Sequence, residues 1–211
     1  NTGQVLELEN HGNPVPYESE NTTHFSVLDQ DGNAVSITQT VNTSFGSGMI
    51  IEGTGIILNN EMDDFSVQPG VPNVYGLVGA EANSIAPQKR PLSSMSPTLL
   101  VKDNQTFMVI GSPGGPRIIT TVVQSIISVI DYGMDIQAAV DAPRIHHQWK
   151  PNKLRIEADY RVNTSTLLAL GHQIEKKGSW SLAHGIVFEV NTGIIYGGAD
   201  HRNQDSLAIG W

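Results

Sequence analysis

The chain has 211 residues, of which 39% are apolar and 16% charged, so it is long enough for one large domain with a packed core and too apolar for disorder. Its formal net charge of −9 argues against a nucleic-acid partner, which would require a basic face. The absence of cysteine excludes disulfides, a thiolate nucleophile and cysteine-type zinc sites. No stretch approaches the roughly 20 apolar residues of a membrane-spanning helix.

The first part of the chain predicts a linker followed by β structure. Residues 1–21 are polar and acidic, so we expect an exposed linker, and a start without an initiator Met or a basic leader is typical of the C-terminal part of a longer precursor. Strand-like alternation runs from Thr23 and resumes at Val35 after an Asp31-Gly32 turn. A further strand is expected over residues 55–58.

The second part of the chain mixes strands and helices. The Pro-, Gly- and Asn-rich residues 66–91 predict a long loop, and loops of this length inside a domain are usually functional. The run 118–130 is apolar nearly all round, which predicts a helix buried between layers. The other expected elements are a hairpin over 98–110, helices near 135–142 and 163–171, a hairpin over 185–196 and a last strand at 206–209. Strands and helices without strict alternation indicate an α+β fold with largely antiparallel sheets.

The pair Thr22-Thr23 is a candidate catalytic unit. If the bond between Asn21 and Thr22 is cut, the new α-amino group, with a pKa of about 7.7–8.0, lies beside the Thr22 hydroxyl and can take its proton. The hydroxyl oxygen is then activated for acyl transfer. Taken alone, the pair fits an ordinary β-strand equally well, since threonine favours strands.

Gly114-Gly115 is the second candidate. Two adjacent residues without Cβ, just before a helix, allow backbone N–H groups to converge on an anion, which the helix dipole also favours. Such a nest suits a phosphate or the oxyanion of a tetrahedral intermediate, although the Lys-Ser/Thr ending of a phosphate-binding loop is missing. A plain tight turn is the alternative.

Three further segments carry polar groups that a site could use. Ser93 and Ser94 lie between two prolines and could donate to a carboxylate, with a serine-rich turn as the alternative. The acids of 59–64 follow a predicted strand and suit a metal or an ammonium group, with a solvated turn as the alternative. His146 and His147 are adjacent on a predicted strand and point to opposite faces, so we expect structural or surface roles.

Four of these segments, in this order, resemble signature blocks of the gamma-glutamyltransferase family, in its small subunit. The blocks are Thr22-Thr23-His24-Phe25, Asn59-Asn60-Glu61-Met62-Asp63-Asp64-Phe65, Pro91-Leu92-Ser93-Ser94-Met95-Ser96-Pro97 and Gly111-Ser112-Pro113-Gly114-Gly115. The resemblance covers essentially all of residues 22–211. It implies an N-terminal nucleophile hydrolase with a four-layer αββα sandwich shared between a large and a small subunit, in which residues 1–21 are the tail of the large-subunit region.

The resemblance also implies a role for individual residues. Thr22 matches the nucleophile, Thr40 the threonine that supports it, and Asn21-Thr22 the bond cut in self-processing. The positions for the substrate are Asn42, Glu61 and Asp64 on the α-amino end, Ser93 and Ser94 on the α-carboxylate, Gly114 and Gly115 as the oxyanion hole, and Tyr75 at the tip of a lid loop. The implied reaction is transfer or hydrolysis of the γ-glutamyl group of glutathione and related compounds, with water, an amino acid or a peptide as acceptor.

The implied protein needs no metal and no cofactor, and family resemblance alone places it in the periplasm or outside the cell. The departures from the family pattern are Pro116, His184-Gly185 and His201, and none of them falls on a catalytic position. Two other interpretations stay open: a related acylase, of the cephalosporin or poly-γ-glutamate type, and an unprocessed homologue that binds or scaffolds. While residues 1–21 remain attached, the Thr22 nitrogen is an amide and cannot act as a base.

Overall fold

The computed structural model describes residues 22–210. Its regular elements, in chain order, are β1 (Thr23–Leu28), β2 (Ala34–Gln39), η1 (Glu61–Asp64), η2 (Glu81–Asn83), β3 (Thr98–Lys102), β4 (Gln105–Gly111), α1 (Arg117–Ile130), α2 (Ile136–Asp141), β5 (Ile145–His146), β6 (Leu154–Glu157), α3 (Thr164–Ala169), β7 (Ile174–Lys177), β8 (His184–Glu189) and β9 (Ile194–Ala199). The fold is therefore α+β, as the sequence predicts.

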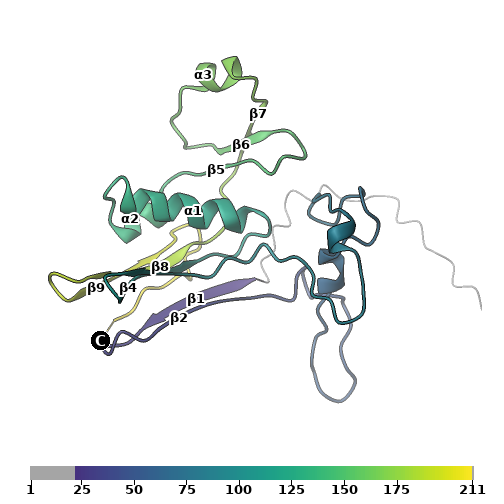
Figure 1. Ribbon diagram of the computed structural model, residues 1–211, viewed down its shortest axis with the longest axis horizontal. Coiled ribbons are helices and arrows are strands. Elements are labelled where there is room, and N and C mark those ends of the chain that lie inside the picture. Colours follow the sequence, from purple (N-terminus) through teal and green to yellow (C-terminus); the bar gives the residue numbers. More distant parts are fainter. Residues whose placement is uncertain (1–21, 211) are drawn as a thin grey trace, which may run out of the picture.

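The main body consists of three stacked layers (Figure 1). The central layer is an antiparallel sheet in the order β3-β4-β8-β9, and the hairpin of β1 and β2 packs on one face of it. A hydrogen bond from the Ser36 hydroxyl to the Ile110 carbonyl, 3.0 Å long, joins this hairpin to β4. Helices α1 and α2 cover the opposite face of the sheet. The described residues thus supply one helical and two β layers of an αββα sandwich.

The core lies between the central sheet and the two helices. Strand β4 is central and covered on both faces, so Met108, Val109 and Ile110 have no exposed surface. Met108 and Ile110 pack with apolar residues of α1 and α2, among which Ile118 and Val140 are at most 1% exposed. Burying a side chain of this kind contributes about 1.5–3 kcal/mol, so this contact fixes the helices on the sheet.

A smaller unit projects from the helical side of the body (Figure 1). Its sheet has the order β5-β6-β7, with β5 and β6 antiparallel and β6 and β7 parallel. The crossover between β6 and β7 contains α3, whose N-cap Asn163 accepts a hydrogen bond from the Ser165 backbone N–H. The unit returns the chain to the body along residues 178–183, beside the turn that precedes α1.

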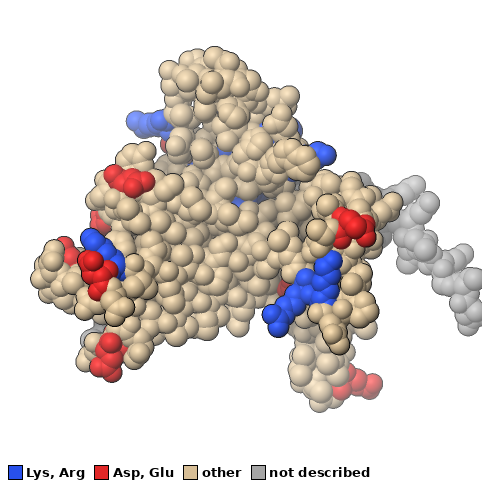
Figure 2. Space-filling view, viewed as in Figure 1, with Lys and Arg blue, Asp and Glu red and all other residues tan. Residues whose placement is uncertain are grey.

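One face of α1 is uncovered in the described part of the chain. Ile119, Val123, Ile127 and Ile130 are 39–52% exposed, although Ile118 and Val122 on the inner face are buried. Within residues 22–210, the prediction that this helix is buried on all sides is therefore wrong. The space-filling view shows few charged side chains over this part of the molecule (Figure 2). Such an apolar face indicates a surface that another part of the protein or a partner covers.

Two predicted strands are absent from residues 22–210. The segment 55–58 forms only a single bridge, between Ile57 and Ile50, and residues 206–209 have no regular secondary structure. Both segments have β propensity, but propensity produces a strand only where a neighbouring backbone is available. The long loop over 66–91 is confirmed, with η2 as its only helical turn in that range. Within the described residues, no helix combines the length and apolarity needed to cross a bilayer.

Candidate active site

Thr22 lies immediately before β1 and is 9% exposed. Its hydroxyl donates a 2.9 Å hydrogen bond to the Oγ1 atom of Thr40, which also accepts a 2.8 Å hydrogen bond from the backbone N–H of Asn42. The antiparallel register of β1 and β2, in which Thr23 pairs with Gln39, places these two ends side by side. Thr40 therefore fixes the orientation of the Thr22 hydroxyl, in the way that a nucleophile requires.

His24 lies two residues beyond Thr22 and packs between the hairpin and the central sheet. Its ring accounts for the absence of a side chain at Gly111, because a Cβ there would lie 2.2 Å from His24 Cε1. Both ring nitrogens are hydrogen-bonded, to Thr38 and Ser26, and the ring stacks on His184 with 6.5 Å between centroids. Burial, and then the neighbouring His184, lower the pKa of His24 to about 4, so it is neutral at pH 7. Nothing in the local sequence indicates this role of His24.

Gly114 and Gly115 form the turn before α1, with φ values of 133° and 56°. Both values lie in the region that side chains with a Cβ rarely adopt, which explains the glycine pair. The carbonyls of Gly114 and Gly115 accept from Arg117 and Ile118, each at 3.2 Å, so the turn leads directly into the helix. The N–H groups of the turn and the positive end of α1 suit an oxyanion.

Tyr75, in the loop over 66–91, connects this loop to both parts of the site. Its hydroxyl donates a 2.9 Å hydrogen bond to the Asn42 carbonyl. Its ring packs against Gly115, where an added Cβ would lie 3.4 Å from Cδ1 and from Cε1. A chain of contacts therefore runs from Thr22 through Thr40, Asn42 and Tyr75 to the glycine turn. The structure brings together these sequence-predicted residues, which are spread over residues 22–115 of the chain.

Glu61 and Asp64 lie on η1 and form a carboxyl pair. Partial burial, and then the adjacent Asp64 carboxyl, raise the pKa of Glu61 to about 7. Burial is also the main reason why the pKa of Asp64 is raised, which the hydrogen bond with Glu61 partly offsets. The buried Oε1 of Glu61 has no donor among the described residues, so a shared proton or a bound cation is needed to satisfy it. The pair is suited to an ammonium group.

The carboxyl pair predicts a pH dependence for an ammonium-bearing substrate. Because the pKa of Glu61 is raised to about 7, its charge is lost as pH falls through that value. We expect the KM for such a substrate to fall by about tenfold between pH 6 and pH 8, as the proton leaves the pair. Glu61→Gln should raise KM at pH 8 and flatten this profile. A wild-type KM that is constant across this range would contradict the assignment.

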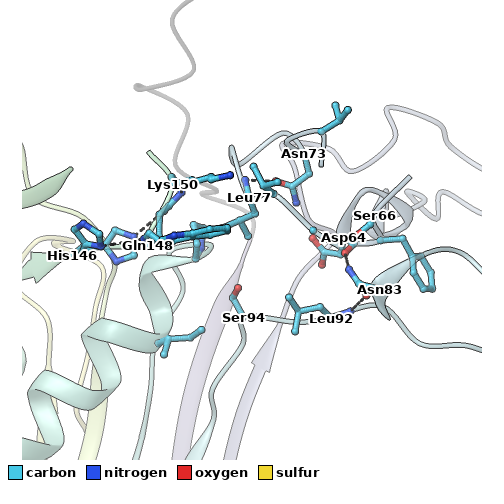
Figure 3. A pocket seen from close by; sticks show the side chains of 18 of the residues that line it. Asp64, Ser66, Asn73, Leu77, Asn83, Leu92, Ser94, His146, Gln148 and Lys150 are labelled. Atoms are coloured by element: carbon cyan, nitrogen blue, oxygen red, sulfur yellow. Dashed lines mark hydrogen bonds between the residues drawn. The ribbon is translucent and has the colours of Figure 1, made fainter. Parts of the chain in front are cut away.

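Ser94 and Asp64 line a cavity of about 290 Å³, which lies between the loop over 66–91 and residues 146–150 (Figure 3). Residues of the 66–91 loop lie on one side of it, and His146, Gln148 and Lys150 face them from the other side. Ser93 is exposed and accepts a hydrogen bond from the Met95 N–H at 3.2 Å. Neither Ser93 nor Thr22 lines this cavity, so it is separate from the nucleophile.

His146 is the last residue of β5 and His147 follows it outside the strand, and the two side chains differ in burial. His146 is 3% exposed, its Nδ1 is hydrogen-bonded to the Thr120 hydroxyl at 2.9 Å, and burial lowers its pKa to about 4. His147 is partly exposed and pairs with Asn152 at 3.1 Å. Both contacts are structural, and the two rings do not form a ligand pair.

A buried ionic network lies behind the glycine turn and was not predicted from the sequence. Arg144 and Asp200, at most 2% exposed, are paired at 2.5 Å. Arg202 binds both oxygens of Glu157, at 3.0 and 2.6 Å, and Asp200 at 2.9 Å. Each carboxylate also accepts backbone N–H groups, including those of Trp180 and Ala183. The network joins the segment of Asp200 and Arg202 to residues 180–183, which pack against the glycine turn.

The described residues contain one cluster with ligand atoms close enough for a metal ion, formed by Asp141, Asp200 and His201. The oxygens of Asp200 already accept from Arg144 and Arg202, whose positive charges would repel a cation. His201 Nδ1 pairs with Asp141 Oδ1 at 2.7 Å. The cluster is therefore better described as the edge of the ionic network.

The fold and the site together define an N-terminal nucleophile hydrolase architecture. A family model described as gamma-glutamyltranspeptidase matches residues 5–210, and the chain belongs to this family. The glutathione hydrolase proenzyme of Escherichia coli is 52% identical over 201 residues, which are 95% of this chain and 34% of that protein. The chain thus spans about a third of the length of this curated relative.

Solved structures show the same similarity. The gamma-glutamyltranspeptidase T380A mutant from Helicobacter pylori superposes with a TM-score of 0.82 at 52% identity, over 86% of this chain and 100% of that one. A cephalosporin acylase from Bacillus halodurans superposes with a TM-score of 0.77 at 28% identity, over 89% of this chain and 34% of that one. Asn21, the other side of the expected processing bond, lies outside the described residues.

Proposed function

We propose that the protein transfers or hydrolyses γ-glutamyl groups through an acyl-enzyme on Thr22. The observation that carries this proposal is the buried hydroxyl pair of Thr22 and Thr40, linked through Asn42 and Tyr75 to the Gly114-Gly115 turn. A nucleophile, its supporting hydroxyl and an oxyanion turn are the parts that acyl transfer needs. Family membership and the carboxyl pair of Glu61 and Asp64 support a γ-glutamyl donor.

The mechanism begins with cleavage of the Asn21–Thr22 bond, which frees the Thr22 α-amine. This amine takes the hydroxyl proton while Thr22 Oγ1 attacks the γ-carbonyl carbon. The tetrahedral oxyanion is held by the N–H groups of Gly114 and Gly115, and its collapse expels the amine part of the donor, which receives the proton. Water or the amine of an amino acid or peptide then attacks the acyl ester and regenerates Thr22.

The donor is recognised by the amino-acid end of its γ-glutamyl group. Glu61 and Asp64, with the Asn42 amide, suit the α-ammonium, and the hydroxyls of Ser93 and Ser94 can donate to the α-carboxylate. Glutathione carries this zwitterion and a γ-amide, so it fits the site. The remaining two thirds of the protein, as a large subunit, would place the fourth, helical layer over the exposed face of the β1–β2 hairpin. We place the enzyme in the periplasm or outside the cell, on family resemblance.

Three anilides with the same leaving group test this assignment in the full-length protein. We expect γ-glutamyl p-nitroanilide to be cleaved, and two analogues to lose on the order of 10²-fold or more in kcat/KM. Glutaryl p-nitroanilide lacks only the α-amine, and 4-aminobutyryl p-nitroanilide lacks only the α-carboxylate. Each leaves polar groups of the site without the substrate group that would pair with them.

The same assay separates the rival functions. Equal rates with the glutaryl compound would contradict amino-acid recognition and favour an acylase for amine-free acyl groups, as the likeness to the cephalosporin acylase structure suggests. A folded protein that cleaves none of the three anilides and keeps the Asn21–Thr22 bond intact would indicate a homologue that never matures.

A further inference from the structure

Ser181 has an unusual conformation for its residue type. Its φ is 61°, in the left-handed region, where a serine is strained. The residue is 7% exposed, and its Oγ is buried without a hydrogen-bond partner among residues 22–210. Both properties are unfavourable for the folded state. The buried hydroxyl loses its hydrogen bonds to water and gains none within the protein.

The Ser181 side chain packs against the glycine turn. A Cβ built on Gly114 would lie 2.0 Å from Ser181 Oγ and 2.9 Å from Ser181 Cβ. The serine therefore occupies the volume that a side chain at Gly114 would need, and its hydroxyl contacts the turn from behind. Gly114 has a φ of 133°, so its backbone has an unusually wide range of conformations available unless a neighbour restricts it.

The segment that carries Ser181 is itself held firmly. Arg144 Nη1 donates to the carbonyls of Trp180 and Ser181, at 2.7 and 3.2 Å. On the other side, the backbone N–H of Leu182 donates to Ser112 Oγ at 3.2 Å, which ties the segment to the strand end just before the turn. Strained conformations persist only where the surroundings determine them in this way.

We infer that Ser181 is a positioning residue for the Gly114-Gly115 turn that would hold the oxyanion. Arg144 holds Ser181 in place, and the contact of Ser181 with Gly114 fixes the direction of the N–H groups of the turn. This inference rests on the proposed function. The hydroxyl is buried, so it does not touch the substrate, and its effect is transmitted through Gly114. Unfavourable local features are commonly retained where catalysis requires a fixed geometry, at a cost in stability.

Two variants of Ser181 and one matched control test the inference in the full-length protein. Ser181→Ala removes the hydroxyl, and Ser181→Gly removes both atoms that contact Gly114. Thr121→Val is the control, because Thr121 has no exposed surface and its Oγ1 is likewise buried without a partner, but it lies inside α1. The readouts are Tm, kcat and KM for γ-glutamyl p-nitroanilide, and amide hydrogen exchange of a peptide covering residues 111–116.

We expect Ser181→Ala to keep or raise Tm, to lower kcat roughly tenfold and to leave KM within about twofold, because the turn is mispositioned while the substrate site is intact. Exchange of the 111–116 peptide should become faster. Ser181→Gly should show a larger loss of kcat. Thr121→Val should match Ser181→Ala in Tm but leave kcat and the exchange of the turn unchanged.

Two results would overturn the inference. One is unchanged exchange of the 111–116 peptide in both Ser181 variants, whether or not the enzyme is active. The other is a loss of Tm and a rise in KM together with the loss of kcat, which is what a purely structural residue would produce. Faster exchange of the 111–116 peptide in the Ser181 variants of a protein that releases no p-nitroaniline would support the positioning role of Ser181. The missing activity would then contradict only the proposed function.

Discussion

Replacing Thr22 by alanine is expected to leave the full-length protein uncleaved and to lower γ-glutamyl transfer by about 10⁴-fold or more. The substitution removes the oxygen that forms the acyl ester and that attacks the preceding carbonyl in self-cleavage. The Thr22 hydroxyl is almost completely buried and is held in place by the hydroxyl of Thr40. Intact mass and N-terminal sequencing measure cleavage, and p-nitroaniline release measures transfer.

Two variants provide the controls for this experiment. Thr23→Ala changes the next residue, which is exposed on β1, and should leave both cleavage and transfer in place. Thr22→Ser keeps a hydroxyl and should recover part of both activities. A new N-terminus at residue 22 in the alanine variant would show that another group cuts the chain. A wild-type protein that stays whole while folded would remove the basis for an active enzyme.

Replacing Asp200 by alanine should destabilise the protein by roughly 3–5 kcal/mol, because it leaves Arg144 and Arg202 buried without their shared carboxylate. Asp200 has no exposed surface and also accepts from the Ala183 N–H. Chemical denaturation followed by circular dichroism measures the free energy of unfolding.

Asp205→Ala is the matched control, since Asp205 is exposed and lies in the same terminal segment; we expect a change within about 0.5 kcal/mol. Burial raises the pKa of Asp200, but the charge of Arg144 opposes this effect and the net pKa is lowered. The contribution of Asp200 to stability is therefore present at neutral pH and is lost as pH falls through that lowered pKa. Equal stability of the two aspartate variants would contradict a structural role for the network.

The sequence predicted those parts of the fold that depend on neighbouring residues. The hairpins over 98–110 and 185–196 have turn residues between alternating runs, and both form. The prediction for 206–209 is wrong because strand formation there depends on a distant partner that the described residues do not provide. Local pattern thus determined hairpins and helices, but it could not decide which isolated apolar run finds a partner.

The candidate site shows the same division. Thr22, Gly114 and Tyr75 belong to recognisable segments, and the structure brings them into one chain of contacts. Arg144 and Ser181 were missed, because nothing in their local sequence shows that one will be buried in an ionic network and the other will have a positive φ. Burial and backbone strain are properties of the assembled structure, and a single sequence does not display them.

The uncovered apolar faces have a practical consequence for work with this chain. Besides the outer face of α1, the β1–β2 hairpin exposes Phe25, Val27, Val35 and Ile37 by 38–50%. A polypeptide of residues 22–211 produced alone would present both surfaces to water, and we expect it to precipitate or to require detergent. On the proposed function, soluble protein should come from expression of the whole precursor, in which the large and small parts fold together before the bond between them is cut.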